Sequence, residues 1–322
     1  MPPTTERPIA IYYEHPDWFR PLFAELDRRG VPYVRLNAAN HRFDATDGRP
    51  AYSLLFNRMS PSAYLRGHGN AIFYTLHYLA YLKRHGVRVI NGYDAYVTET
   101  SKALQLSLLE HLGLPYPKAV VINHSAQALE ATRGLQFPVV VKPNIGGSGA
   151  GVQRFDTPER LEDATRGRGG TLDLGIDQTG LVQEYIPAEQ QRIVRVEVLG
   201  GRYLYAIRIN TPGDSFNLCP ADVCQTVGGA QLVRAACPVD APQNNLRVEG
   251  YTPPAEIADQ VERIMRAAQI DVGGVEYMID ARDGRLYYYD INALSNFVAD
   301  APRVVGFDPF ATLVDFLERE AE

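Results

Sequence analysis

The chain has 322 residues, of which 45% are hydrophobic and 22% are charged, so two or three globular domains fit. Its formal net charge of −6 argues against a general nucleic-acid binder, because such proteins hold phosphates with clustered lysine and arginine. No apolar run reaches the roughly eighteen residues of a membrane helix, and residues 1–5 lack signal-peptide features. We therefore expect a cytoplasmic protein without a membrane or nucleic-acid partner, in which Cys219, Cys224 and Cys237 are reduced thiols.

The first part of the chain alternates predicted strands and helices. The predicted strands are residues 9–13, 32–36, 52–56 and 87–90, and the predicted helices are residues 17–29 and 74–83. Strands that alternate with helices favour parallel pairing, since a helix can carry the chain back across the sheet. Residues 1–95 are therefore predicted to form a small α/β domain.

Two further units follow. Thr100-Ser101 can cap a helix over residues 102–112, and residues 119–186 alternate between strand and helix around a glycine-rich loop. The last part has predicted strands at 192–199 and 203–209, a helix at 255–268 and a hairpin from 273 to 292. These patterns predict a central domain at 96–187 and a C-terminal domain at 188–322.

The glycine-rich loop follows an apolar run that ends in Lys142. Four glycines lie between residues 146 and 151, and residues 152–155 form a second predicted strand. Glycines let backbone N–H groups turn toward an anion, so a phosphate fits here. The P-loop and the dinucleotide fingerprint fit poorly, because both need a helix after the glycines. An ordinary β-hairpin with a glycine-rich turn also explains the loop, and Lys142 can instead reach solvent.

Two later segments add polar groups suited to a nucleotide. Residues 181–187 form an apolar strand that carries Glu184 and stops at a proline, and such a segment can hold an adenine between domains. The hairpin brings Glu276 near Asp290 and Asn292, and the last two share a face because they are two residues apart. Carboxylate and amide oxygens are hard ligands for magnesium. A solvated acidic hairpin is the simpler alternative.

In this order, the motifs resemble the ATP-grasp superfamily, and specifically its carboxylate–amine ligases, which include glutathione synthetase, D-alanine–D-alanine ligase and the ribosomal-protein glutamate ligases. The resemblance spans residues 57–310. It rests on six segments in register: Ser101-Lys102, Val141-Lys142-Pro143, the glycine loop, Gln183-Glu184-Tyr185-Ile186, Ala206-Ile207-Arg208 and Asp290-Ile291-Asn292. It implies an α/β fold with three domains and a nucleotide bound between the second and third.

The resemblance also assigns roles to residues. It implies that nucleotide phosphates are contacted by Lys102, Lys142, Gly147, Ser148 and Gly149, that adenine is held by Gln183, Glu184, Tyr185 and Ile186, and that magnesium is held by Glu276, Asp290 and Asn292. The related ligases usually have Asp at the position of Glu276 and Glu at that of Asp290. Where relatives carry a ribose-binding carboxylate this chain has Ile193, so either Glu189 or the backbone is expected to take its place.

The same resemblance implies residues for chemistry and substrate. Arg208 matches a basic residue that touches the transferred phosphoryl group, and Arg58 matches one that can hold the substrate carboxylate. The further pocket candidates are Arg195, Asn217 and Ser295. Surface ion pairs are the alternative reading for these arginines.

The implied activity is an ATP-dependent carboxylate–amine ligase that forms an amide through an acylphosphate and releases ADP and phosphate. It needs ATP and Mg²⁺, for which Mn²⁺ can substitute, a small-molecule or peptide carboxylate and an amine or amino-acid acceptor; a homodimer is compatible with the sequence. The chain lacks the Ser-Pro-Gly that follows Asn292 in several relatives, which suggests a different acceptor. A kinase on the same fold and a non-catalytic nucleotide-binding scaffold are the competing hypotheses. The sequence leaves the acid, the amine and the pathway open.

Overall fold

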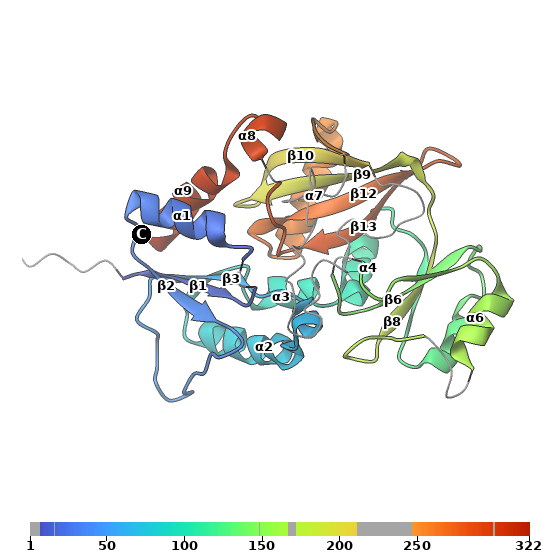
Figure 1. The fold of residues 1–322 in the computed structure, drawn as a ribbon, viewed down its shortest axis with the longest axis horizontal. Coiled ribbons are helices and arrows are strands. Elements are labelled where there is room, and N and C mark those ends of the chain that lie inside the picture. Colours follow the sequence, from blue (N-terminus) through green and yellow to red (C-terminus); the bar gives the residue numbers. More distant parts are fainter. Residues whose placement is uncertain (1–6, 16, 148, 167–171, 211–246, 299) are drawn as a thin grey trace, which may run out of the picture.

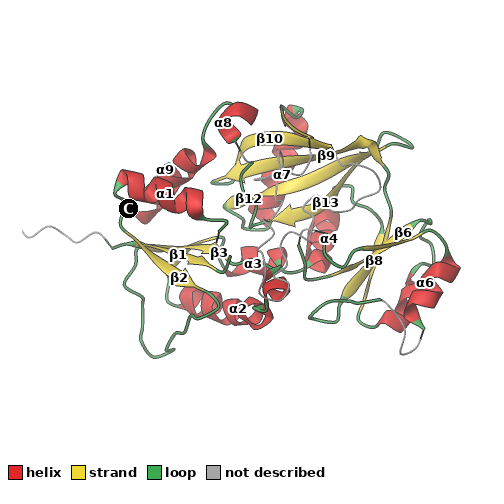
Figure 2. Cartoon of the chain, viewed as in Figure 1, coloured by secondary structure: helices red, strands yellow, loops and turns green. Residues whose placement is uncertain are grey.

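The structure is a computed structural model that describes residues 7–15, 17–147, 149–166, 172–210, 247–298 and 300–322. Three β-sheets follow one another along the chain, each with helices packed against it (Figure 1, Figure 2). Ser148, Asn217 and the three cysteines lie outside the described residues. In the described part, no helix combines the length and apolar character that crossing a membrane requires.

The first sheet has the strand order β2-β1-β3-β4, and all its pairs are parallel, as the sequence predicts. Its strands are β1 (Ile9–Tyr13), β2 (Tyr33–Asn37), β3 (Leu54–Arg58) and β4 (Arg88–Ile90). Side chains of β1 alternate between two cores: Ile9 and Ile11 pack with α1 (Arg20–Arg29), while Ala10 and Tyr12 pack with α2 (Gly69–Arg84). A short 3₁₀ helix, η1 (Ala63–Arg66), precedes α2.

The second sheet is antiparallel, with the order β5-β8-β6-β7. Its strands are β5 (Ala119–Ile122), β6 (Val139–Pro143), β7 (Gln153–Phe155) and β8 (Gly180–Glu184), and its helices are η2 (Ser125–Gln127), α5 (Ala128–Ala131) and α6 (Pro158–Thr165). Val139, Val141 and Val182 form a core with the helices. Because neighbouring residues on a strand point to opposite faces, Lys142 and Gln183 lie on the other face.

The third sheet is also antiparallel and has the order β11-β10-β9-β12-β13. Its strands are β9 (Ala188–Leu199), β10 (Arg202–Asn210), β11 (Arg247–Tyr251), β12 (Val272–Asp280) and β13 (Leu286–Asn292). One face packs on α7 (Ala255–Ala267), and Leu109 of α4 (Lys102–His111) belongs to the same core. The other face joins the core around α1.

The remaining helices connect the units. Helix α3 (Tyr93–Glu99) follows the first sheet, and α8 (Ala301–Val304) and α9 (Pro309–Ala321) follow the third. Helix α9 returns to lie beside α1, so the two chain ends of the described structure share one side of the molecule (Figure 1). Arg29 of α1 forms ion pairs with Asp315 and Glu318 of α9. The first and third units are thereby tied together.

Candidate functional site

The candidate metal ligands sit on neighbouring strands of the third sheet. Glu276 on β12 lies directly opposite Asp290 on β13, and Gly274 lies opposite Asn292. The register shifts between Glu276 and Tyr277, which leaves Tyr289 as an extra residue of β13. Such a bulge turns consecutive side chains toward one face. The structure therefore brings together the three residues that the sequence analysis assigned to magnesium.

Glu276 is buried and engaged on both oxygens. Arg195 of β9 donates from Nε at 2.8 Å and from Nη2 to Glu276 Oε1, and the Tyr289 hydroxyl donates to Oε2 at 2.6 Å. Arg195, proposed from the sequence as a substrate residue, thus forms a buried ion pair with a candidate metal ligand. Within the described residues, no group of three His, Cys, Asp or Glu side chains is placed to hold a metal, and the candidate set is two carboxylates and an amide.

The second carboxylate is paired with a lysine. Lys102 Nζ donates to Asp290 Oδ1 at 2.7 Å, and Asn292 Nδ2 donates to Oδ2 at 3.0 Å. Burial alone would raise the pKa of Asp290, but the attraction and hydrogen bond of Lys102 hold it below its usual range. The pair also raises the pKa of Lys102 against the effect of burial. Lys102 reaches this position because it is the first residue of α4, whose N-terminus is capped by Ser101.

Lys142, at the end of β6, is buried without an ion pair or hydrogen bond from its ammonium group to any described residue. Burial and the nearby positive charge of Lys102 lower its pKa to about 7, although Asp290 acts in the opposite direction. A buried ammonium without a partner is costly. An anion bound beside Lys102 and Lys142 would remove that cost, so the two lysines define a site for negative charge.

Asn144 links the elements that carry the two lysines, and the sequence analysis missed it. Its Oδ1 accepts hydrogen bonds from Ser101 Oγ at 3.1 Å and from Ala103 N at 3.0 Å. The Lys102 amide donates to the Asn144 carbonyl at 3.3 Å. This places the start of α4 against the end of β6. The only signal in the sequence is an asparagine two residues after Lys142, which by itself indicates nothing about α4.

Gln183 supplies an acceptor without a donor. It lies opposite Val140 of β6 and shares a face with Lys142, which lies opposite Leu181. Its Oε1 is buried and has no hydrogen-bond partner in the part of the chain that the structure describes. A buried carbonyl oxygen without a donor is costly, and a ligand amino group would satisfy it.

In the rest of the predicted adenine-binding segment, Glu184 and Tyr185 form hydrogen bonds within the central domain. Glu184 accepts from the Gln136 amide at 3.0 Å, and the Glu184 and Tyr185 amides donate to the Lys118 and Pro138 carbonyls, both at 2.9 Å. Ile186 is buried, and Glu189, proposed for the ribose, is exposed at the start of β9. The sequence analysis also missed a neighbouring cation, Arg154 of β7, whose guanidinium lies 4.3 Å from the centre of the Tyr185 ring.

The glycine loop lies against the first domain. A Cβ on Gly147 would stand 3.5 Å from Ser62 Cβ. Gly149 and Gly151 have φ of +72° and +75°, a backbone conformation that favours glycine. The Gly147 contact is an ordinary one, whereas Gly151 is needed both for its conformation and for close approach, since a Cβ there would stand 2.8 Å from Pro143 Cγ.

The guanidinium of Arg58 donates to backbone carbonyls, whereas the sequence analysis proposed that it holds a substrate carboxylate. Its Nη1 donates to the Ala293 carbonyl at 3.1 Å and its Nη2 to the Ser295 carbonyl at 2.7 Å. Ser295 Oγ in turn donates to Glu197 Oε1, while Glu197 Oε2 is buried and has no hydrogen-bond partner among the described residues. Burial lowers the pKa of Arg58 to about 10 despite the charges of Glu99 and Glu197. These contacts fix the segment that follows β13.

Arg208 lies on the opposite face of the third sheet from Arg195 and Glu276. It lies opposite Val194 on β9, whereas the next residue, Arg195, faces Glu276. Adjacent strand residues point to opposite faces, so Arg208 and Arg195 lie on opposite faces of the sheet. The Arg208 guanidinium stacks 3.8 Å from the centre of the Tyr251 ring.

These residues fit a nucleotide with its metal. Lys142 is buried and Lys102 is half-buried beside the place where phosphates would lie, Gln183 Oε1 lacks a donor among the described residues, and the hairpin offers carboxylate and amide oxygens. A separate crevice of about 700 Å³ lies between α2, β4 and the start of β12, and none of the residues predicted for the site lines it.

Solved structures of other proteins have a similar fold. A solved structure of the ATP-grasp ligase PsnB complexed with a minimal precursor superposes with a TM-score of 0.67, covering 98% of this chain and 99% of that chain at 19% identity. A second PsnB structure contains a phosphomimetic precursor variant, Mg and ADP, with a TM-score of 0.64 and 19% identity over 97% and 98% of the chains. The chain therefore has the three-part α/β fold of ATP-grasp proteins.

Sequence comparison identifies the relatives. The chain is 25% identical over 252 residues to the glutamate–LysW ligase ArgX of Sulfolobus acidocaldarius, covering 77% of this chain and 76% of that protein. It is 24% identical over 259 residues to the carbamoyl phosphate synthase large chain of Thermus thermophilus, covering 75% of this chain. The chain spans 22% of the length of that larger protein.

Residues 99–218 match the family model of the RimK-like ATP-grasp domain. This match covers 120 of the 322 residues, and ATP-grasp carboxylate–amine ligases are among the proteins to which the chain is similar. The resemblance inferred from the six sequence motifs is confirmed.

Proposed function

We propose that this chain is an ATP-dependent ligase that activates a substrate carboxylate as an acylphosphate and joins it to an amine. The observation that carries the proposal is Lys142, a buried ammonium without an ion pair in the described structure, beside Lys102 and opposite the candidate metal hairpin. A site for negative charge beside Lys102 and Lys142 in an ATP-grasp fold suits the phosphates of a nucleoside triphosphate. We also propose domain boundaries at 1–95, 96–187 and 188–322, within each of which one sheet lies whole.

The proposed chemistry proceeds in two displacements. A carboxylate oxygen attacks the γ-phosphorus, the bond from phosphorus to the β,γ-bridging oxygen breaks, and ADP leaves. The amine nitrogen then attacks the acyl carbon, phosphate leaves with the bond electrons, and the nitrogen loses a proton. Lys102 and Lys142 hold the phosphates and offset their charge during transfer. Glu276, Asp290 and Asn292 would hold magnesium, which neutralises phosphate charge when bound.

We further propose that the substrates are amino acids or peptides. Two of the similar proteins are a glutamate–LysW ligase and the ligase PsnB, which has also been solved with a precursor peptide. The proposal for this chain rests on that likeness and on the departure after Asn292, where Ala293 to Phe297 replace the pattern of several relatives.

The test is a screen of amino acids and short peptides, read first by acid-stimulated ADP release and then by trapping. Hydroxylamine supplied in place of the amine should give an ATP-dependent hydroxamate with the acid that stimulates ADP release. Formation of a stable phosphoester without any hydroxamate would replace the ligase with a kinase. Acid-independent ADP release, or none, would refute the proposed reaction.

A further inference from the structure

Asn91 occupies a buried position between the first and third sheets. It follows β4 directly, is 1% exposed and has a φ of +53°, a conformation that asparagine tolerates better than most residues. The Asn57 side chain donates to its carbonyl at 3.0 Å. Neither residue belongs to the site assigned above.

The Asn91 side chain uses its full hydrogen-bonding capacity. Its Oδ1 accepts from the amides of Asp271 at 2.9 Å and Val272 at 3.0 Å. Its Nδ2 donates to the carbonyls of Val272 at 2.6 Å and Ala293 at 2.7 Å. An amide has two acceptor lone pairs and two donor hydrogens, and all four are used here. A rotated amide would place donors against donors, so the orientation is fixed by its partners.

These partners are the two ends of the hairpin that carries the candidate metal ligands. Val272 begins β12, and Ala293 directly follows Asn292, the last residue of β13. The strands approach closely at this point, since a Cβ on Gly273 would stand 2.2 Å from the Asn292 carbonyl oxygen. Little room is left for Asn292 to move while Asn91 holds both strand ends.

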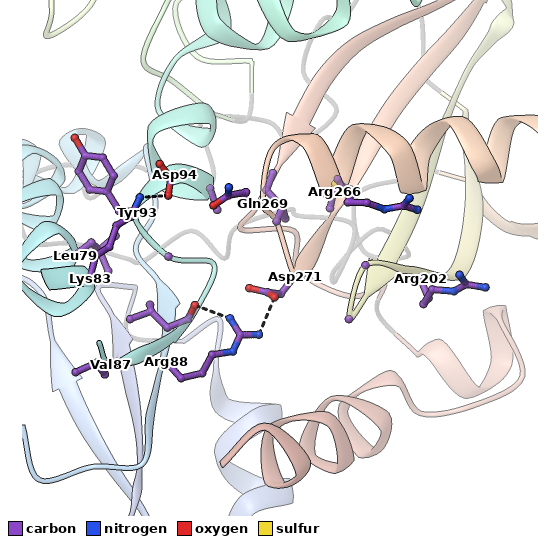
Figure 3. Close-up of a pocket in the computed structure, with 17 residues that line it drawn as sticks. Leu79, Lys83, Val87, Arg88, Tyr93, Asp94, Arg202, Arg266, Gln269 and Asp271 are labelled. Atoms are coloured by element: carbon purple, nitrogen blue, oxygen red, sulfur yellow. Dashed lines mark hydrogen bonds and ion pairs between the residues drawn. The ribbon is translucent and has the colours of Figure 1, made fainter. Parts of the chain in front are cut away.

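Further contacts hold Asp271 and Ala293, the residues that flank the two ends of the hairpin. The Asn91 amide donates to Asp271 Oδ2 at 2.9 Å, and Arg88 of β4 donates to Asp271 Oδ1 at 2.9 Å. Figure 3 shows this Arg88–Asp271 pair crossing from β4 to the residue before β12, on the wall of the 700 Å³ crevice. Arg58 and Glu99 bond to the Ala293 carbonyl and amide. Ala293 is therefore held on both of its backbone polar groups by buried side chains from residues before α4.

We propose that Asn91 is a positioning residue for the metal site: by joining Val272 to Ala293 it fixes where Asn292 stands relative to Asp290. This inference rests on the proposed function only in taking Asn292 as a metal ligand. It assigns the first domain a role in metal binding although none of the proposed metal ligands, Glu276, Asp290 and Asn292, belongs to it.

The test compares two buried Asn→Asp variants of the full-length chain. Asn91→Asp keeps the size of the side chain and tolerates the positive φ, but its carboxylate loses both donors and faces two carbonyl oxygens. Asn57→Asp is the matched control, because Asn57 is also buried, donates one bond to Asn91 and makes none to β13. Thermal unfolding shows whether each variant folds. If Asn91→Asp does not fold, Asn91→Gly suits the backbone and removes the side chain without burying a charge.

The readout is Mn²⁺ binding in the presence of ADP, followed by electron paramagnetic resonance, together with ADP affinity in EDTA. Asn91→Asp should weaken Mn²⁺ binding about tenfold or more, with ADP affinity in EDTA unchanged, since a tenfold change needs only about 1.4 kcal/mol. Asn57→Asp should stay within about twofold of the wild type. Equal Mn²⁺ binding by both variants, or none by the wild type, overturns the inference. Weakened Mn²⁺ binding in a chain that never yields a hydroxamate would keep the inference and refute the ligase.

Discussion

Replacing Lys142 with Met removes a charge that the protein buries without a partner among its described residues. Burial and the charge of Lys102 lower the pKa of Lys142 from 10.5 to about 7. Since one pKa unit corresponds to 1.36 kcal/mol, keeping Lys142 charged in the ligand-free protein costs about 5 kcal/mol. We expect this cost to appear in both stability and nucleotide binding.

The sign of the stability effect follows from the two pKa values. Between pH 7 and 10.5 the unfolded chain keeps a proton on Lys142 that the folded protein has lost, so wild-type stability rises with pH across this window. Below pH 7 the full penalty applies. Lys142→Met should therefore be more stable than the wild type by up to about 5 kcal/mol at pH 6, and the difference should vanish toward pH 10.5.

Nucleotide binding should change in the opposite direction. Bound phosphate restores the charge of Lys142, so wild-type binding at pH 8 should take up roughly one proton. Lys142→Met should lose this uptake and bind at least about 30-fold more weakly, because truncating one partner of a buried charge pair costs about 2 kcal/mol or more. Calorimetry with a nonhydrolysable ATP analogue in two buffers measures both quantities.

Lys118→Met is the matched control, because Lys118 lies in the same domain with an exposed side chain that donates to the Gly134 carbonyl. It should bind nucleotide like the wild type. The reasoning is refuted if Lys142→Met binds with wild-type affinity, or if the wild type takes up no proton at pH 8.

Three further predictions test other parts of the site. Asp290→Ala should lose magnesium-dependent ADP release while Asp283→Ala, in the hairpin turn, keeps it; normal activity of the first variant would remove β13 from the metal site. Arg195→Ala should lower the urea-unfolding free energy by about 3–5 kcal/mol by breaking a buried pair, against about 1 kcal/mol for Arg208→Ala, and equal losses would contradict the opposite-face placement. Burial raises the pKa of Glu99 from 4.5 to about 7. Between pH 4.5 and 7 the folded protein therefore keeps a proton on Glu99 that the unfolded chain has lost, and the free energy of unfolding should fall by about 3 kcal/mol as the pH rises across this range. Glu99→Gln should abolish this slope, and an unchanged slope would refute it.

Local patterns predicted most of the fold. The strand at 9–13 was placed with its observed bounds, because an apolar run of β-branched and aromatic residues is a strong strand signal. Of the two residues predicted to cap α4, Thr100 and Ser101, it is Ser101 that caps the helix. The hairpin is predicted from two strands joined by the tight turn Arg282-Asp283-Gly284, and the spacing of Asp290 and Asn292 predicts their shared face.

Residues whose roles depend on distant partners were not predictable in the same way. Arg208 lies opposite Val194 only because of a register that includes an irregularity between Tyr203 and Tyr205, and no local pattern reveals that register. Asn91 and Asn144 look like ordinary loop residues in the sequence. Their importance comes from distant partners, up to 43 residues away for Asn144 and up to 202 residues away for Asn91.

The central claim is that the substrate carboxylate itself takes the γ-phosphoryl group. An acid labelled with ¹⁸O in its carboxylate, incubated with ATP, magnesium and the amine, tests this directly, because an acylphosphate leaves one labelled oxygen on the phosphate that the amine displaces. The account predicts inorganic phosphate carrying one ¹⁸O atom for each amide formed. Amide formation with unlabelled phosphate, or with the label in AMP, would contradict it.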